Sequence, residues 1–276
     1  YLDTNTYHCF ACGKTGDVIQ FIQDKESCTK HEAILKAKAL IGKEIINTVT
    51  QKTMETPANF NALFPKFMES LEKSEKAREY RQERGLDHKA LQIGYNGGKL
   101  FKKLRQCIIF PLKDKDGNIV SLYGRRAFEY QSNGKWKSSY KLEQGKHYYS
   151  ENRKGLYPNY PPQETETLII TEAIIDAATL LQIPEIIEHF KILSCYGNLA
   201  FVKEAREAVK NLPKLKEVII FFDGDQGGLN GIKHVTEIMQ QIKPNVKISA
   251  VATPEKEDVN SLYVKYDKDC LIQLIN

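Results

Sequence analysis

In the second half of the chain, short apolar runs end in acidic residues. Glu172 follows the run LIIT, Asp223 and Asp225 follow VIIFF, and Asp258 follows ISAVA after a short loop. These runs alternate with helix-like stretches, which is the rhythm of a parallel sheet covered by helices. Because the carboxyl ends of parallel strands meet at one edge of a sheet, we expect these carboxylates to lie close together.

Carboxylates gathered at such an edge require cations. At about 4 Å and an effective dielectric constant near 20, two of them repel by about 4 kcal/mol. Oxygen ligands favour Mg²⁺ or Mn²⁺ over zinc, and ions held in this way often bind phosphates and stabilise charge in phosphoryl transfer. We also expect Gly224, Gly227 and Gly228 to let the backbone turn tightly and approach a ligand closely. The pattern therefore predicts a divalent-metal site for a phosphate-containing substrate.

The chain has 276 residues, enough for two compact domains. We expect an α/β fold, α+β overall, in four segments: 1–45 with a Cys pair and two helices, a linker over 46–66, a mixed segment over 67–160 and a parallel-sheet segment over 161–276. The linker is predicted because 46–66 lacks periodicity and holds two prolines. One helix is predicted over 67–84, followed by short strands with a hairpin turn at 115–118.

Charge is divided unevenly along the chain. Residues 84–154 carry 16 Lys or Arg against 6 Asp or Glu, whereas residues 161–276 carry 12 against 17. A basic block interleaved with tyrosines suits a single-stranded nucleic acid, and it precedes the segment that concentrates carboxylates.

The cysteines and the hydropathy pattern bear on location. The six cysteines are scattered, which favours a reducing compartment. No apolar run approaches the roughly 20 residues that cross a bilayer. We therefore expect a cytoplasmic protein without a membrane partner.

The motifs resemble those of a known family. Similarity to the three acidic motifs of the Toprim fold is found, in order, in TEAIIDA, FFDGDQGGLNG and EKEDVNSL. The amino-terminal half of the RNA-polymerase core of bacterial DnaG-type primases is resembled by LRQCIIFPLKDKDGNIVSLYGRR, and the second half of their zinc ribbon by YHCFACGKTGDVIQFI. The stretch SSYKLEQGKHYY resembles primase-like proteins of plasmids and other mobile elements.

The resemblance implies template-directed synthesis of short RNA primers on single-stranded DNA from ribonucleoside triphosphates, with a replicative helicase as a candidate partner. Nucleotidyl transfer would depend on Mg²⁺ or Mn²⁺. The catalytic residues carried over are Glu172, Asp223 and Asp225, and the metal ligands are Glu172, Asp176, Asp223, Asp225 and Asp258. The residues carried over for phosphate contacts are Arg105, Arg125, Arg126, Lys141 and Lys154.

Three residues depart from the family pattern. Ala173 replaces the usual glycine after the glutamate, and Cys107 stands where arginine is common. Asn260 stands where many members have a second acid, so one metal is expected to be held less tightly.

Cys9 and Cys12 have the spacing of half a tetrahedral zinc site. The resemblance places the other two ligands upstream, so we expect the chain to begin within the ribbon and zinc to be bound only in a longer protein. An internal site completed by Cys28 and His31 has an acceptable spacing. A capping box at Thr29–Glu32, however, places His31 in the first turn of a helix.

Two other functions stay open at this point. One is a different Toprim activity, as a metal-dependent nuclease or a topoisomerase-like enzyme. The other is a catalytically decayed accessory module that binds single-stranded DNA, a possibility raised by Ala173 and Asn260. The sequence has no phosphate-binding G-x-x-x-x-G-K-[ST] loop, and we interpret His147, His189 and His234 as surface or packing residues.

Overall fold

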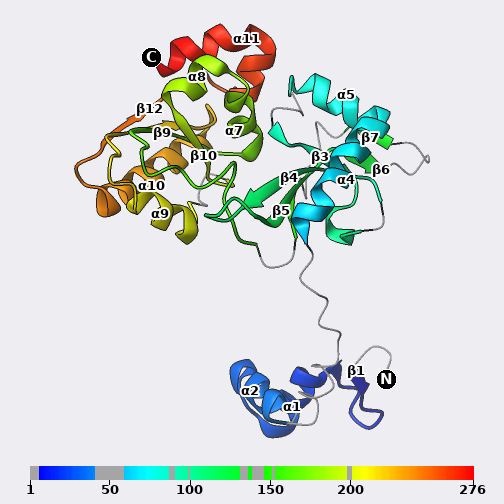
Figure 1. The fold of residues 1–276 in the computed structure, drawn as a ribbon. Helices are drawn as coiled ribbons and strands as arrows, with labels where there is room; N and C mark the ends of the chain where they lie inside the picture. Colours follow the sequence, from blue (N-terminus) through cyan, green and yellow to red (C-terminus); the bar gives the residue numbers. More distant parts are fainter. Residues whose placement is uncertain are drawn as a thin grey trace. The chain divides into compact units, whose positions relative to one another are not determined.

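The computed structural model describes residues 6–40, 59–86, 91–98, 100–130, 136–138, 146–150, 153–197 and 201–276 (Figure 1). It divides into an amino-terminal unit, residues 1–58, and a core unit, residues 59–276. Within the described ranges, no helix has the length and apolar character needed to cross a membrane.

The amino-terminal unit is a hairpin followed by two helices. Its elements are β1 (Thr6–His8), β2 (Thr15–Asp17), α1 (Val18–Glu26) and α2 (Lys30–Leu40). The Asp17 carboxylate caps α1 by accepting from the Gln20 backbone N–H at 2.9 Å. Glu32 accepts from the Thr29 N–H at 2.8 Å, and this confirms the predicted capping box of α2.

The core unit begins with α4 (Phe60–Lys73) and α5 (Glu75–Glu83). Helix α4 therefore starts inside the range predicted as a linker, and the single helix predicted over 67–84 is two helices separated at Ser74. The Asn59 side chain caps α4, whose buried face carries Phe64, Phe67 and Leu71. Pro65 lies inside α4 and concealed this apolar pattern in the sequence. Residues 46–58 of the predicted linker lie outside the described ranges.

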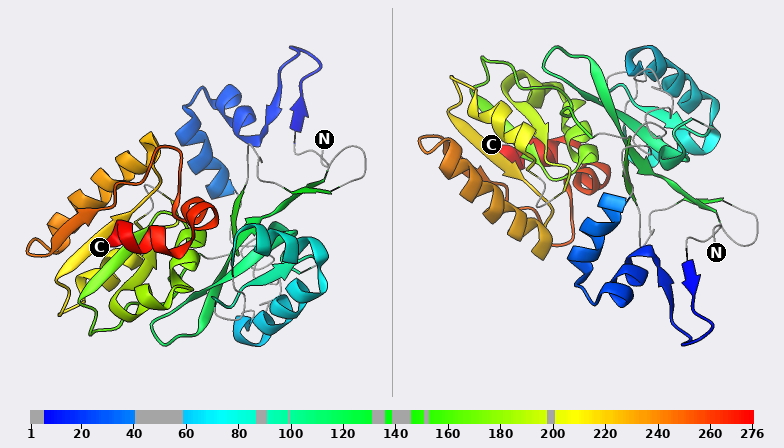
Figure 2. Two further views of the ribbon diagram at one scale, coloured as in Figure 1. Left: turned by 90° about the horizontal axis from the view of Figure 1, so that it is seen from above. Right: turned by 90° about the horizontal axis from the view of Figure 1, so that it is seen from below.

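A four-stranded parallel sheet forms the carboxyl-terminal part of the core unit, as the sequence predicted. Its strands, in the order β10-β9-β11-β12, are β9 (Thr167–Thr171), β10 (Lys191–Ser194), β11 (Glu217–Phe221) and β12 (Lys247–Ala250). One face is covered by α7 (Ile174–Leu181), α8 (Pro184–His189) and α11 (Val259–Ile275). The other face is covered by α9 (Lys203–Lys210) and α10 (Gln226–Ile242), and Figure 2 shows both layers.

Alternation along the strands explains this layering. In β9, Ile169 packs with α7 and α11, whereas its neighbours Leu168 and Ile170 pack with α9 and α10. Successive strand residues point to opposite faces, so an unbroken apolar run is what a sheet covered on both sides requires. The fold class predicted from the sequence is thus confirmed.

A second, antiparallel sheet precedes the parallel one. Its strands, in the order β3-β4-β5-β8, are β3 (Gly94–Asn96), β4 (Cys107–Lys113), β5 (Ile119–Arg126) and β8 (His147–Tyr149). A short 3₁₀ helix, η1 (Lys102–Leu104), precedes β4, and a separate hairpin pairs β6 (Phe128–Tyr130) with β7 (Trp136–Ser138). The Asp114 carboxylate closes the predicted hairpin turn by accepting from the backbone of Asp116 and Asn118.

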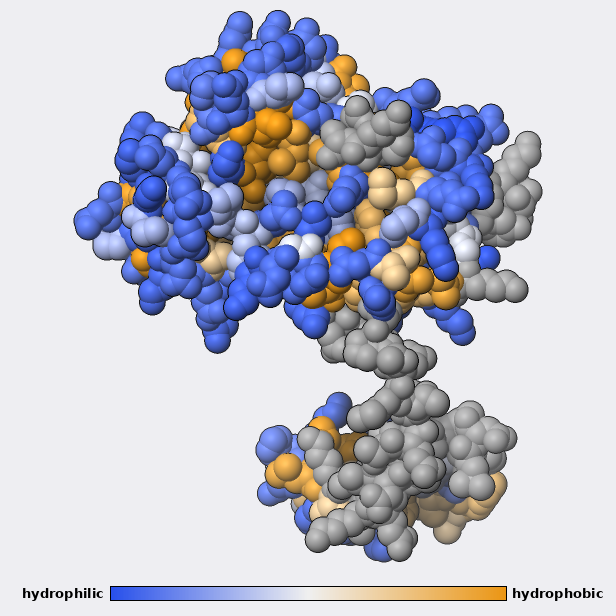
Figure 3. Space-filling model, viewed as in Figure 1, coloured by the Kyte–Doolittle hydropathy of each residue, from blue (hydrophilic) through white to orange (hydrophobic). Residues whose placement is uncertain are grey.

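One hydrophobic cluster joins the two sheets of the core unit. It runs from Phe110 and Tyr123 of the antiparallel sheet through Tyr157 to Ile169 and Phe221 of the parallel sheet. Hydrophilic residues cover most of the visible face of this unit, and hydrophobic residues show in a hollow beside α7 and again over the part that holds β4 and α4 (Figure 3). Because the core is shared, the edges of the two sheets are held against each other, and the candidate site lies where they meet.

Candidate metal and phosphate site

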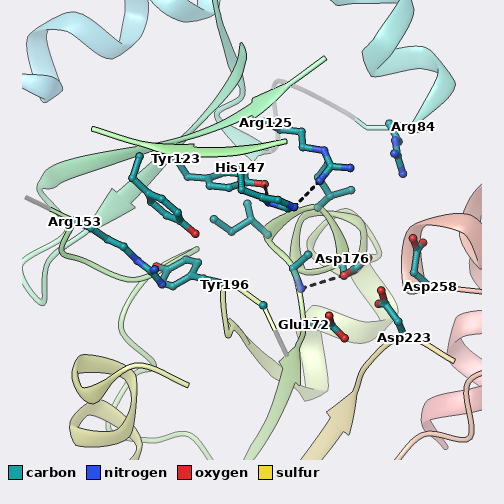
Figure 4. Close-up of a pocket in the computed structure, with 15 residues that line it drawn as sticks. Arg84, Tyr123, Arg125, His147, Arg153, Glu172, Asp176, Tyr196, Asp223 and Asp258 are labelled. Carbon is teal, nitrogen blue, oxygen red and sulfur yellow. Dashed lines mark hydrogen bonds between the residues drawn. The ribbon is translucent and has the colours of Figure 1, made fainter. Parts of the chain in front are cut away.

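A pocket of about 370 Å³ in the core unit lies between the carboxyl edge of the parallel sheet and strands β5 and β8 (Figure 4). Four carboxylates lie toward one side, and arginine, tyrosine and histidine side chains lie toward the other. The acidic side consists of Glu172, Asp176, Asp223 and Asp258, and the opposite side includes Arg84, Tyr123, Arg125, His147, Tyr149, Arg153 and Tyr196.

Glu172 and Asp223 stand at the ends of neighbouring parallel strands, β9 and β11. Each has one buried oxygen, Glu172 Oε2 and Asp223 Oδ1, without a hydrogen-bond partner. Burial, followed by the charges of Asp225 and Asp258, raises the pKa of Glu172. Burial, followed by the charge of Glu172, raises the pKa of Asp223 to about 7. These two carboxylates therefore lack a compensating positive charge.

Asp176 is placed by the first turn of α7. Its side chain is buried and accepts from the Ala173 backbone N–H at 3.1 Å. Burial and the nearby Asp258 and Asp223 raise the pKa of Asp176 well above its usual value. The Asp176 carboxyl group therefore belongs to the acidic cluster and also fixes the start of the helix.

Asp225 and Asp258 cap helices. Asp225 accepts from the Gly228 N–H at 2.8 Å at the start of α10, and Asp258 accepts from the Ser261 N–H at 2.6 Å at the start of α11. Asp258 also lines the pocket, whereas Asp225 is exposed and does not. Of the five predicted metal ligands, four are thus brought into one pocket, and Asp225 lies outside its lining.

The chemistry of these donors fits a divalent cation. Across the described ranges, no three His, Cys, Asp or Glu side chains are grouped as a preformed metal site. The two orphaned oxygens and the raised pKa values nevertheless show a cluster in which negative charge is poorly compensated. Oxygen-only ligands of this kind suit Mg²⁺ or Mn²⁺.

Gly224 lets the loop that carries Asp258 approach the end of β11. Its N–H donates to the Glu257 carbonyl at 2.8 Å, and a Cβ at this position would lie 1.9 Å from the Pro254 carbonyl oxygen. This glycine was expected to admit a ligand, but the close neighbour is backbone of the chain itself. Gly224 therefore brings the last acidic residue to the other carboxylates.

We expect Gly224→Ala to destabilise the protein by about 3 kcal/mol, the upper part of the usual range for overpacking, because the clash is with backbone. Thermal unfolding measures the effect. Gly98→Ala is the matched control, since its nearest neighbour would be a side-chain atom at 3.9 Å. Equal stability of the two variants would contradict the packing role of Gly224.

Three arginines line the pocket with the carboxylates. Arg125 projects from β5, and Arg84 follows α5. The Arg153 guanidinium lies between two rings, 4.4 Å from the centroid of Tyr149 and 4.7 Å from that of Tyr196. The pocket thus presents cations and carboxylates to the same volume.

His147 holds Arg125 in place. Arg125 Nη1 lies 2.9 Å from His147 Nε2, and the Tyr123 hydroxyl lies 2.8 Å from Nδ1. Because a guanidinium can only donate, Nε2 must accept and the proton must reside on Nδ1, which donates to the Tyr123 oxygen. Burial and Arg125 lower the pKa of His147 to about 4, so the ring is neutral near pH 7. His147 lies at the surface and packs against Tyr123, as interpreted from the sequence, and it also contacts Arg125.

The other residues carried over for phosphate contacts lie elsewhere. Arg105 and Lys154 are exposed outside the pocket lining, and the Arg126 guanidinium stacks 4.1 Å from the centroid of Tyr148. Lys141 lies outside the described ranges. Arg84 and Arg153 were not predicted as site residues. The only hints in the sequence were Gly85, which directly follows Arg84, and Tyr149, which lies four positions before Arg153.

In the amino-terminal unit, Cys9 and Cys12 lie in the turn between β1 and β2. The Cys9 N–H donates to the Lys14 carbonyl at 2.8 Å, and hydrogen bonds from Cys12 lower the pKa of the Cys9 thiol. A lowered pKa favours the thiolate form that binds zinc. Cys28 instead packs against Ile22, and its thiol donates to the Ile22 carbonyl at 3.9 Å. The described residues form no internal four-ligand site.

Comparisons with known proteins agree with this architecture. Residues 169–263 match the Toprim-like family model, and residues 2–53 match that of the CHC2 zinc finger. The DNA primase of Thermotoga maritima is 24% identical over 313 residues, covering 98% of this chain and 52% of that protein. The zinc-binding and RNA polymerase domains of Aquifex aeolicus primase have a TM-score of 0.62 at 20% identity, covering 99% of this chain and 73% of that one. A DnaG primase catalytic domain bound to single-stranded DNA has a TM-score of 0.56 at 19% identity, covering 78% and 76%.

The matched segments follow the order of the quoted motifs, with the zinc-finger match before the Toprim-like match. The chain spans about half the length of the curated DNA primases it matches, 50% to 58% in three of them. The Toprim-like match, residues 169–263, contains most of the parallel sheet and the acidic residues that line the pocket. The chain is therefore similar to the bacterial DnaG-type primases in its zinc-finger segment, in its Toprim-like segment and in its fold.

Proposed function

We propose that the core unit synthesises short RNA primers on a single-stranded DNA template. The observation that carries this proposal is a single pocket in which four carboxylates face three arginines. Such a pocket has donors for divalent cations and for the phosphates of a ribonucleoside triphosphate, and nucleotidyl transfer requires both.

Glu172, Asp176, Asp223 and Asp258 would hold Mg²⁺ or Mn²⁺, with Asp225 fixing the start of α10 beside them. When bound, these ions neutralise the charge that develops on the transferred phosphate and its leaving group. Glu172 is the candidate to accept a proton from the attacking 3′-hydroxyl, since its pKa is raised and one of its oxygens has no partner.

Arg125 and Arg153 would bind the triphosphate. Both guanidiniums are oriented before a ligand arrives, Arg125 by His147 and Arg153 by the two tyrosine rings. Preorganised donors lose less entropy when they bind phosphate oxygens. The remaining basic residues, among them Arg105, Arg126, Lys141 and Lys154, would contact the template backbone outside the pocket.

Three further elements of the proposal rest on the similarity to DnaG-type primases. Cys9 and Cys12 would bind zinc together with ligands upstream, and a replicative helicase would recruit the protein to DNA in the cytoplasm. The template itself is supported by the related DnaG catalytic domain, whose structure is bound to single-stranded DNA. The likeness to mobile-element primases stays a prediction.

The test is an assay with single-stranded DNA, labelled ribonucleotides and Mg²⁺ or Mn²⁺, using both this chain and one extended upstream. Short labelled RNA products that depend on template and metal are expected. Cleavage of the template without synthesis would indicate a nuclease instead. Salt-sensitive DNA binding without any turnover, unchanged by Asp223→Asn, would indicate an accessory module.

His147→Leu should weaken binding of a ribonucleoside triphosphate about fivefold, the size of one hydrogen bond, because Arg125 loses its acceptor. His147→Gln, which keeps an acceptor oxygen, should recover part of the loss. Titration calorimetry measures both, with His189→Leu at the exposed end of α8 as the matched control. If His147→Leu binds as tightly as the wild type, the ring does not orient Arg125.

A further inference from the structure

Asn260 occupies the position where many family members carry a second acid, and its contacts explain the exchange. Its side chain is buried, 1% exposed, in the first turn of α11. Its Nδ2 donates to the Arg84 carbonyl at 2.8 Å and to Thr179 Oγ1 at 2.9 Å, and its Oδ1 accepts from Arg84 Nη1 at 2.9 Å. Both amide hydrogens and the carbonyl oxygen are therefore used.

An aspartate could not make these contacts. Thr179 Oγ1 already donates to the Ile175 carbonyl at 2.9 Å, so it accepts from Asn260. A carboxylate at 260 would place one oxygen against the Arg84 carbonyl oxygen, where two acceptors repel. The network thus distinguishes asparagine from aspartate, although the two have nearly the same shape.

Arg84, which Asn260 contacts through two hydrogen bonds, lines the pocket. Arg84 is the residue directly after α5, and Gly85 follows it with a φ of +58°, a conformation that favours glycine. The Gly85 carbonyl accepts from Gln182 Nε2 at 2.7 Å, so the turn is fastened to the parallel-sheet part of the core unit. Figure 4 shows the Arg84 side chain directed toward the side of the pocket where Asp258 and Asp176 lie.

We propose that Arg84 binds a phosphate group of the substrate in this pocket and that Asn260 is the positioning residue that holds Arg84 there. The last acidic motif has then exchanged a candidate metal ligand for a hydrogen-bonded support of a cation. The inference rests on the proposed function only for the identity of the phosphate-bearing substrate. Binding of a polyphosphate anion to the pocket tests it directly.

The experiment measures the dissociation constant of tripolyphosphate by calorimetry in the presence of Mg²⁺. Arg84→Ala should weaken binding about tenfold, as loss of a charge-assisted contact does. Asn260→Asp should weaken it about threefold to tenfold in the wild type and have no effect in an Arg84→Ala background, because the two residues act as one unit. Arg81→Ala, on the same helix but paired with Glu72 at 3.1 Å, should bind normally.

Mn²⁺ binding, followed by electron paramagnetic resonance, separates the two roles of position 260. A vacant metal position would make Asn260→Asp bind Mn²⁺ more tightly, and this result would overturn the inference. Unchanged or weaker Mn²⁺ binding supports it. Circular dichroism and the melting temperature test whether Asn260→Asp is folded, and Arg84→Ala, at a partly exposed residue, is a variant that does not depend on that outcome.

The inference and the proposed function can fail separately. Absent primer synthesis with intact, Arg84-dependent tripolyphosphate binding would reject the function and leave the inference standing. Primer synthesis with tripolyphosphate binding that is equal in wild type and Arg84→Ala would reject the inference alone. A wild type that does not bind tripolyphosphate would reject it as well.

Discussion

Glu172→Gln is expected to lower the rate of primer synthesis by about a thousandfold or more. The same change is expected to make the metal-free protein more stable. Charge stabilisation by held metal ions is worth several kcal/mol, and about 4 kcal/mol corresponds to about a thousandfold in rate. The gain in stability follows because the amide removes a buried charge that Asp225 and Asp258 repel. Rates of primer synthesis and melting temperatures in EDTA measure the two effects.

The matched control is Glu166→Gln, which lies just before the opposite end of β9. Glu166 is exposed and pairs with Lys216 at 2.7 Å, so its loss should leave synthesis within about twofold and stability within about 0.5 kcal/mol. A Glu172→Gln variant that loses activity and also melts at a lower temperature in EDTA would point to structural damage. Full activity in this variant would remove Glu172 from the chemistry.

The second large effect concerns pH. The pKa of Asp223 is raised to about 7, so the metal-free folded state keeps a proton that the unfolded state releases near pH 4. Where the folded state binds more protons, stability falls as pH rises. In EDTA, the stability of the wild type relative to Asp223→Asn should therefore fall between pH 5 and pH 7. Above pH 7 this relative stability should stay at its low value. A shift of this size is a few kcal/mol, or about 5–10 °C in melting temperature.

Comparison with Asp223→Asn is needed because His147 acts in the opposite direction. Its pKa is lowered to about 4, so charging it destabilises the folded state as pH falls below its unfolded value. Mn²⁺ should raise the melting temperature of the wild type more at pH 8 than at pH 6, since the ion competes with protons, and it should stabilise Asp223→Asn less. If the difference in melting temperature between the two proteins is the same across this pH range, the pKa of Asp223 is not raised in the folded state.

The apolar runs and the acidic residues that follow them were enough to predict the parallel sheet and the edge at which the carboxylates gather. Each apolar run is long enough for a buried strand, and each acid stands directly after a strand or at a helix start, so sequence order fixes their placement. The same reasoning could not separate Asp225 from its neighbours. A capping aspartate and a metal-binding aspartate look alike until the direction of the side chain is known.

The arginine side of the pocket could not be predicted because it depends on contacts between distant segments. Arg84 and Asn260 are 176 positions apart, and neither the end of α5 nor the start of α11 signals the other. His147 gave no signal because its partners, Arg125 and Tyr123, lie on another strand more than 20 positions away. Helix α4 was missed at its start because Pro65 interrupts the pattern locally, whereas burial of Phe64 and Phe67 outweighs that cost.

The hydrophobic cluster that passes through Tyr157 has a consequence for how such proteins can change over time. Because the acidic edge and the arginine-bearing strands are seated on one continuous interior, neither can be replaced by the corresponding part of a relative unless the contact surface between them is replaced too. We therefore expect that exchanging only one half for that of a relative would disrupt this cluster. Such an exchange would also change how the four carboxylates and three arginines of the pocket face each other.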